Sequence, residues 1–370
     1  MTQHDPWRTA TAVGCRLAGP GTKDVSRAEM EEAVAGLRAA AERVPALVAS
    51  VSQLPATRPD DVTLVVDRRG IIEANAATME RMLGIAAAAN PVIDAADVTP
   101  PGAAVGAMLA VLGGRILGQF DPFSERPRLL LVAPNIVAMR NKLDADAADF
   151  RLWVCLHEQT HRAQFAAAPW LTGHLTGLIT ELVGAEAENG SVWAELPDRV
   201  RRLRSARRDD PKSTTTGVGM LAAIAGGRAA AALDRVMAVM SLLEGYADVM
   251  MDAVGPHVVP TVATIRTAFD QHRARGGLSA LVGKLMGLDS KMTQYSEGAK
   301  FCQAVLDGPG LATLNLAWDG PDNLPNLDEI HHPQRWIDRM QRWTGVGDPE
   351  GPPPRRATDP DMTPTWGLGG

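Results

Sequence analysis

The residues with the clearest chemical potential are His157, Glu158 and His161, in the segment His-Glu-Gln-Thr-His. Residues four apart lie on one face of an α-helix, so the two imidazoles can bind the same metal ion. The carboxylate of Glu158, beside the first histidine, can reach a water molecule on that ion. Two imidazoles, an activated water and a carboxylate base are most of what a zinc-dependent hydrolase needs. The spacing therefore predicts a Zn²⁺ site, provided that the segment is helical.

The sequence around the histidines favours one long helix. No glycine or proline interrupts the chain from residue 141 to residue 168, and Pro169 ends or bends what precedes it. Leu152 and Leu156 lie on an apolar stripe with helical spacing. We therefore expect a helix over residues 144–168. The alternative is a purely structural helix on which the two histidines are core or solvated residues.

A catalytic zinc site needs a third protein ligand and keeps its fourth position for water. The best candidate is Glu244, because an apolar helical pattern surrounds it and places Asp248 on the same face. Glu244 can then bind the metal while Asp248 accepts the N–H of a ligand histidine. His174 and Glu181 are the other candidates. Gly245 is costly inside a helix, and a close approach of two helices would explain it.

The composition limits the class of protein. The chain has 370 residues, enough for one large domain or two closely packed ones. Abundant alanine and an aromatic content of only 4% favour helices over sheets. The net charge of −6 gives no reason to expect a nucleic-acid partner. The N-terminus does not resemble a signal peptide, and no segment is apolar enough to span a membrane, so we expect a cytoplasmic protein.

The cysteines agree with that location. Cys15, Cys155 and Cys302 are odd in number, far apart in the chain and surrounded by apolar residues. This pattern is typical of a reducing compartment and not of a disulfide framework. None of them forms a Cys-x-x-Cys zinc motif.

Helical patterns fill most of the chain. Ser26 begins a helix with a Ser-x-x-Glu capping box, and a second short helix is expected over residues 46–54. Two short apolar runs interrupt the helical pattern and predict strands. The predicted fold is mainly α and zincin-like, with a small β element near residues 60–72 and 128–132.

Three regions are expected along the chain. Residues 1–140 form a mostly helical N-terminal region with short strands, and residues 141–345 hold the metal-binding helices. Residues 346–370 are rich in proline and glycine and are expected to be disordered. A cluster of six arginines between Arg199 and Arg208 is interpreted as a solvated face, with an anion-binding or gating role as the alternative.

Several motifs together resemble an actinobacterial zincin-like family. They cover roughly residues 10–345 and include Asp149-Phe150-Arg151-Leu152-Trp153-Val154, His157-Glu158-x-x-His161-x-x-Gln164-Phe165, Glu244-Gly245-Tyr246-Ala247-Asp248 and Lys291-Met292-x-Gln294-Tyr295. Members are described as zinc-dependent metalloproteases or hydrolases, and one branch as coenzyme F420 biosynthesis-associated proteins. The resemblance implies a mostly helical zincin-like fold with His157, His161 and Glu244 as ligands to zinc.

The function expected from these residues is that of a gluzincin-like metallopeptidase. Zinc would lower the pKa of its water, and Glu158 would take the proton and pass it to the leaving amine. Tyr295 is the candidate donor to the oxyanion, and Tyr246 is the alternative. The rival hypothesis is a zinc-binding scaffold or regulatory protein, or a small-molecule hydrolase without peptidase activity. A third hypothesis is a helical interaction protein with a fortuitous motif.

Overall fold

Helices form most of the protein in this computed structural model, which describes residues 5–19, 25–90, 93, 101–187, 226–274 and 292–343. The mainly α fold expected from the sequence is confirmed. In chain order the described elements are α1 (Pro6–Leu17), α2 (Arg27–Ser52), β1 (Val62–Val66), α3 (Arg68–Ala89), α4 (Gly102–Gly113), β2 (Gly118–Asp121), β3 (Arg128–Val132), α5 (Ala133–Leu143), α6 (Ala147–Ala167), α7 (Leu171–Ala187), α10 (Gly226–Val254), α11 (Val262–Ala274), α13 (Met292–Asp307), α14 (Leu311–Asn315), α15 (Leu327–His331) and α16 (Pro333–Trp343). Short 3₁₀ helices lie at Leu316–Trp318 and Pro321–Asn323.

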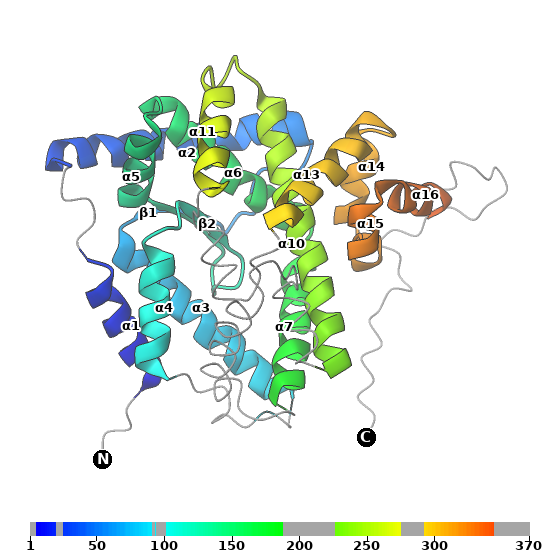
Figure 1. Ribbon diagram of the computed structural model, residues 1–370, viewed down its shortest axis with the longest axis horizontal. Helices are drawn as coiled ribbons and strands as arrows, with labels where there is room; N and C mark the ends of the chain where they lie inside the picture. The colour runs from blue at the N-terminus through cyan, green and yellow to red at the C-terminus, as the bar shows by residue number, and fades with distance from the viewer. Residues whose placement is uncertain are drawn as a thin grey trace, which may run out of the picture.

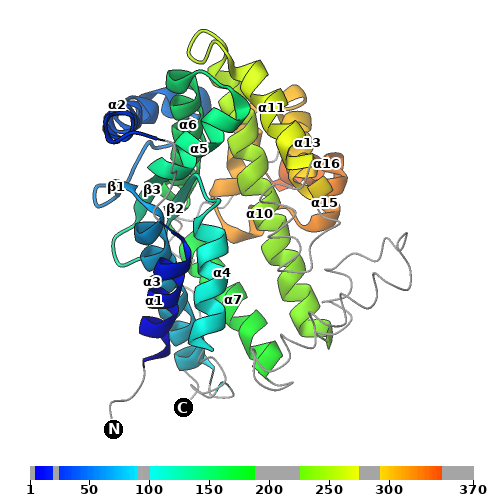
Figure 2. The ribbon, with the colours of Figure 1, turned by 60° about the vertical axis from the view of Figure 1, so that its left-hand side comes forward.

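A small sheet lies between two groups of helices (Figures 1 and 2). The helices α2, α5 and α6 lie on one side of it, and α1, α3 and α4 lie on the other. The long helix α10 packs against α6, α7 and α13. It therefore connects the helices near the sheet with the helices of the C-terminal part. The short helices α14, α15 and α16 follow α13.

The sheet has the strand order β1-β3-β2, with β1 parallel and β2 antiparallel to the central strand β3. Side chains of a strand alternate between its faces. Leu129 and Leu131 of β3 accordingly enter the largest core, whereas Leu130 and Val132 pack against Ile71 of α3 in a smaller one. β2 is left at an edge of the sheet, and it lies against α6.

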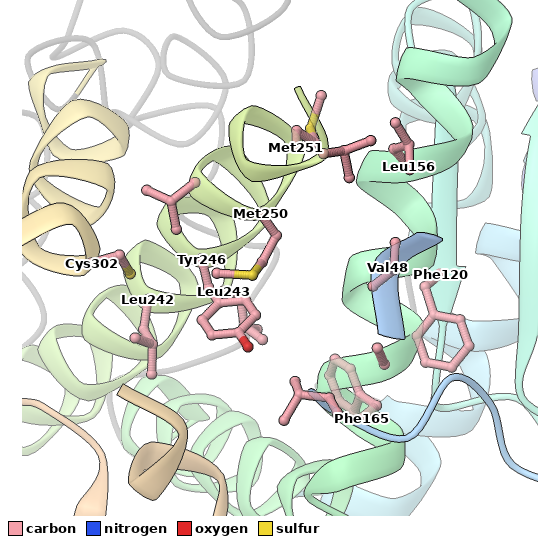
Figure 3. Packing of buried hydrophobic residues seen from close by; sticks show 14 of the residues in the cluster. Val48, Phe120, Leu156, Phe165, Leu242, Leu243, Tyr246, Met250, Met251 and Cys302 are labelled. Carbon is pink, nitrogen blue, oxygen red and sulfur yellow. The ribbon is translucent and has the colours of Figure 1, made fainter. Parts of the chain in front are cut away.

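The largest core lies between the two helices that carry the predicted metal ligands. Leu156 and Phe165 of α6 and Met250 of α10 belong to it, and Figure 3 shows their side chains in the region between those helices. The same core includes Leu37 from α2 and Trp336 from α16, so it draws on both ends of the described chain. Burial of each such side chain stabilises the fold by about 1.5–3 kcal/mol.

The first long helix differs in part from the prediction. The capping box at Ser26 is present, as expected. A separate helix over residues 46–54 is wrong, because α2 continues through Pro45 without a break. Proline removes one backbone hydrogen bond from a helix. Val44 and Val48, on either side of Pro45, are both buried in the core, and this packing offsets the loss.

The β element is confirmed near residues 60–72 and 128–132, but its first part is shorter than predicted. The strand ends before Asp67, and α3 begins there because the Asp67 carboxylate accepts the backbone N–H of Gly70 and caps the helix. The edge strand β2 was not predicted.

Other expectations concern the chain as a whole. The described helices include none long and apolar enough to cross a membrane. All three cysteines are free, and Cys155 and Cys302 are buried. The predicted tail over residues 346–370 and the arginines between residues 199 and 208 lie outside the described residues. The cytoplasmic location stays a prediction.

Candidate metal centre

The helix that carries the two histidines forms where the sequence predicts it. The Asp146 carboxylate accepts the backbone N–H groups of Ala148 and Asp149 and so begins α6. Most of α6 is buried, since α2 packs on one side of it and α10 on another. His157 and His161 lie on the side of α6 that faces α10.

The structure brings His157, His161 and Glu244 together. The Nε2 atoms of the two histidines are 3.1 Å apart. The Glu244 carboxylate is 3.4 Å from Nε2 of His157 and 3.7 Å from Nε2 of His161. All three side chains are partly buried, and their ligand atoms lie within 4.8 Å of one another. The three predicted ligands therefore converge from two helices on one point.

The spacing of these atoms fits a tetrahedral zinc ion. With metal–ligand bonds of about 2.0–2.1 Å, tetrahedral ligand atoms lie roughly 3.3 Å apart. The two Nε2 atoms are 3.1 Å apart, and the two carboxylate oxygens of Glu244 lie 3.4 Å from His157 and 3.7 Å from His161, one oxygen on each histidine, so all three distances are close to that value. Two imidazoles and one carboxylate also leave a fourth position for water, as in catalytic zinc sites. His157, His161 and Glu244 are therefore the residues that would hold the ion.

The two other candidates for the third ligand lie elsewhere. The His174 ring packs against Trp170, with 5.8 Å between the ring centroids. Glu181 forms an ion pair with Arg235 at 2.6 Å. Neither belongs to the group of ligand atoms around His157.

Glu158 is buried between α6 and β2. The backbone N–H of Phe120 donates to its carboxylate, and a Cβ atom on Gly118 would lie 2.5 Å from its Cγ. Burial raises the pKa of Glu158 to about 7, and Glu244 adds to this while His157 and the Phe120 N–H oppose it. A carboxylate with a pKa near neutrality is suited to accept and return a proton.

The two histidines differ in their pKa values. Burial would lower the pKa of His157, but the hydrogen bond and the charge of Glu244, with smaller contributions from Glu158 and Asp248, raise it to about 9. Burial lowers the pKa of His161, and the positive charge of His157 adds to that effect. Without a metal, the Glu244 carboxylate therefore favours the protonated form of His157, whereas burial favours the neutral form of His161.

Sequence reasoning missed the groups that contact the other ring nitrogens. Nδ1 of His161 is 2.9 Å from Oε1 of Gln164, and Nδ1 of His157 is 3.3 Å from the sulfur of Met251. Gln164 lies three residues after His161 on the same helical face, so helical spacing alone could have indicated it. Met251 follows Glu244 by two helical turns, on the same face of α10.

The role expected for Asp248 is taken by those two residues. The Asp248 carboxylate instead lies 3.7 Å from the Arg266 guanidinium, which also donates to the Asp248 backbone carbonyl. Asp248 still lies close enough to affect the pKa of both histidines through its charge.

Of the two tyrosines proposed as oxyanion donors, only Tyr246 has a side chain among the described residues. Tyr246 is fully buried, and its hydroxyl lies 2.8 Å from Oδ1 of Asn315 while its ring packs edge-on against Trp318. Burial raises the pKa of its hydroxyl, and its partners give it a structural role. Tyr295 falls within α13, but its side chain lies outside the described residues.

Gly245 marks a close crossing of helices, as the sequence suggested, but the partner helix is α13 and not α6. A Cβ atom on Gly245 would lie 2.1 Å from the carbonyl carbon of Gly298, and one on Gly298 would lie 2.0 Å from the Ser241 carbonyl oxygen. The two backbones are therefore in direct contact next to Glu244. This contact sets how closely α10 approaches α13 beside Glu244, the predicted third ligand.

Comparison with known proteins agrees with this geometry. One solved structure, a candidate hydrolase with a novel fold from Chloroflexus aurantiacus, is 27% identical with a TM-score of 0.64. The match covers 91% of this chain and 98% of that one. No curated protein matches the chain. The model of the zincin-like metallopeptidase family matches residues 6–337. The chain therefore belongs to the zincin-like metallopeptidase family.

Proposed function

We propose that the protein is a zinc-dependent metallopeptidase in which Glu158 is the general base. The observation that carries the proposal is the meeting of His157, His161 and Glu244 at zinc-ligand spacing, with the buried carboxylate of Glu158 beside them. When bound, zinc polarises a carbonyl group and lowers the pKa of a water molecule.

The protein's own groups supply the proton transfer. In the metal-free protein burial raises the pKa of Glu158 to about 7, and a cation beside the carboxylate would favour its charged form, which can accept a proton from water and return it to a leaving amine. The Phe120 backbone N–H holds this carboxylate against β2, and this contact limits the orientations open to it. Glu158 therefore acts from a fixed position, as efficient proton transfer requires.

A peptide is the substrate that best suits the surroundings of Glu158. β2 is an edge strand, and its backbone runs directly beside the Glu158 side chain. Edge strands bind extended peptides through backbone hydrogen bonds, with little regard to the peptide sequence. An extended peptide aligned with β2 would bring one of its carbonyl groups close to Glu158 and the two histidines.

The test compares metal content and peptide hydrolysis in three variants. The wild-type protein should contain one zinc ion per chain and cleave members of a fluorogenic peptide library. Glu244→Ala should lose zinc. Glu158→Gln should retain zinc and lose hydrolysis by a factor of about 10²–10⁴, the usual contribution of a general base.

Glu181→Ala is the matched control, because Glu181 was an alternative ligand and lies in an ion pair away from the centre. It should keep both zinc and activity. Undiminished hydrolysis by Glu158→Gln would contradict the mechanism. A zinc-loaded wild-type protein that cleaves no peptide would favour the zinc-binding scaffold or a small-molecule hydrolase instead.

A further inference from the structure

Gln164 contacts both helices of the metal centre. Its side chain is fully buried, and its Oε1 atom lies 2.9 Å from Nδ1 of His161. Its Nε2 atom donates to the backbone carbonyl of Leu243 at 2.9 Å. Leu243 directly precedes Glu244 on α10. One amide group therefore connects a predicted ligand on α6 with the backbone that carries the predicted ligand on α10.

The chemistry of the neighbours fixes the orientation of this amide. The Leu243 carbonyl oxygen can only accept a hydrogen bond, so Gln164 must present its NH₂ group to it. The other end of the amide, its carbonyl oxygen, then necessarily faces His161. A flipped amide would place two acceptors against each other at Leu243, in a site without solvent exposure.

The same logic determines which nitrogen of His161 carries the hydrogen. The Gln164 oxygen can only accept, so Nδ1 of His161 must donate. In a neutral ring this leaves Nε2 without a hydrogen. That atom is the one that lies 3.1 Å from Nε2 of His157 and 3.7 Å from the Glu244 carboxylate. The lone pair of Nε2 is thus available where the ligand atoms converge.

We propose that Gln164 is a positioning residue that holds His161 as the Nδ1–H tautomer and ties α6 to α10 beside Glu244. The inference rests on the proposed zinc site. Without this acceptor, His161 is free to carry its hydrogen on Nε2, where the hydrogen blocks metal binding. Met251 contacts His157 through a thioether, a much weaker acceptor, so the stronger constraint falls on His161.

The test uses Gln164→Met, which keeps the length of the side chain but removes both hydrogen bonds. Loss of such a partner of a ligand histidine typically weakens metal binding by 10–100-fold, so we expect about that change in the Kd for Zn²⁺. Nitrogen-15 NMR of the metal-free protein, with histidine labelled, reports the tautomer directly. His161 should be the Nδ1–H form in the wild type and gain the Nε2–H form in Gln164→Met.

Gln159→Met is the matched control. Gln159 lies on the same helix, is equally buried and also donates from its amide to a backbone carbonyl, that of Ala56. Its amide is not among the groups that contact the histidine ring nitrogens in the described part of the chain, so this variant should keep the tautomer and the Kd of the wild type. Gln164→Glu retains an acceptor for Nδ1 but cannot donate to Leu243. It should restore the tautomer while lowering the Tm.

The outcomes separate this inference from the proposed function. An Nε2–H tautomer of His161 in the wild type, or an unchanged tautomer and Kd in Gln164→Met, would overturn the role of Gln164. A wild-type protein that binds no zinc would overturn the proposed function, while the tautomer of the metal-free protein would still decide the role of Gln164.

Discussion

α6 and α10 carry the predicted metal ligands, but their other faces are held by different kinds of contact. On α6, Arg162 forms a buried ion pair with Asp61 at 3.2 Å and donates to Thr63, so polar groups attach this helix to β1 and to the residue that precedes it. On α10, Gly245 meets Gly298 of α13 backbone to backbone. α6 is therefore held by an ion pair, whereas α10 is held by close backbone packing at two glycines.

The difference shows what determines the position of the histidine pair and what determines the position of Glu244. The relation between His157 and His161 follows from helical spacing and needs no outside partner. The place of Glu244 depends on how closely α10 approaches its neighbours, which local sequence does not determine. We therefore expect changes at the polar anchor to reduce overall stability, and changes at the glycine crossing to act on the metal centre as well.

The largest effect should come from Arg162→Met. The variant leaves the Asp61 carboxylate, whose side chain is only 1% exposed, without its charge partner. Breaking a buried ion pair in this way costs about 3–5 kcal/mol of the free energy of unfolding, which urea denaturation measures. Arg27→Met, at an exposed ion pair with Glu31, is the control and should change little. Equal losses in both variants would show that charge does not anchor α6.

A smaller loss is expected from Gly245→Ala. The added methyl group overlaps the backbone of α13, and overpacking of this kind costs about 1–3 kcal/mol. Since α10 must shift, zinc affinity should fall along with the Tm. Gly177→Ala on α7 is the control, because nothing lies within 4 Å of the added atom. Helix propensity predicts that this control gains up to about 1 kcal/mol.

If Gly245→Ala lowers the Tm but leaves zinc affinity unchanged, the position of Glu244 does not depend on the crossing. A Tm above that of the wild type would mean that α13 yields to the methyl group, and the contrast between the two anchors would then be lost.

The smallest effect concerns pH, at the point where the two helices meet. In the metal-free protein the pKa of His157 is about 9, above its ordinary value, so its pairing with Glu244 stabilises the fold fully below about pH 6.5. That stabilisation is lost as the pH rises through about 9. Zinc must displace the proton, so its affinity should rise over the same range by up to about tenfold per pH unit.

Thermal melts of the metal-free protein and zinc titrations at several pH values check both slopes. Glu244→Gln removes the charge that raises the pKa of His157, so its metal-free Tm should vary less with pH across this window. As the pH rises, the stability of the metal-free wild type should fall and its zinc affinity should rise. A change of both in the same direction would contradict a raised pKa at His157.

The features predictable from the sequence were those that depend on local spacing. The histidine pair, the capping box at Ser26 and the helical class follow from patterns within a few residues. Glu244 was also found, because its apolar surroundings made a solvated glutamate improbable. β2 was missed, since its four residues, Gly-Gln-Phe-Asp, have no strand pattern of their own and form a strand only because β3 pairs with them.

Two errors have a common physical cause. A separate helix was expected over residues 46–54, and Asp248 was expected to accept from a histidine. In each case contacts from distant segments decided the outcome: the core around Val44 retains the helix, and Gln164 and Met251 contact the histidine nitrogens while Asp248 lies beside Arg266 of α11. Local rules identify what a residue can do, and tertiary packing selects among the possibilities.

The origin of the ligands in two helices also has a consequence for the order of folding. His157 and His161 become neighbours as soon as α6 forms. Glu244 joins them only after α10, which is distant in the sequence, has packed against α6. A zinc ion present during refolding would therefore meet a two-histidine site first and gain its carboxylate later. The moment at which its coordination becomes complete marks the docking of α10 on α6, so a spectroscopically visible ion such as Co²⁺ would time that single step of assembly.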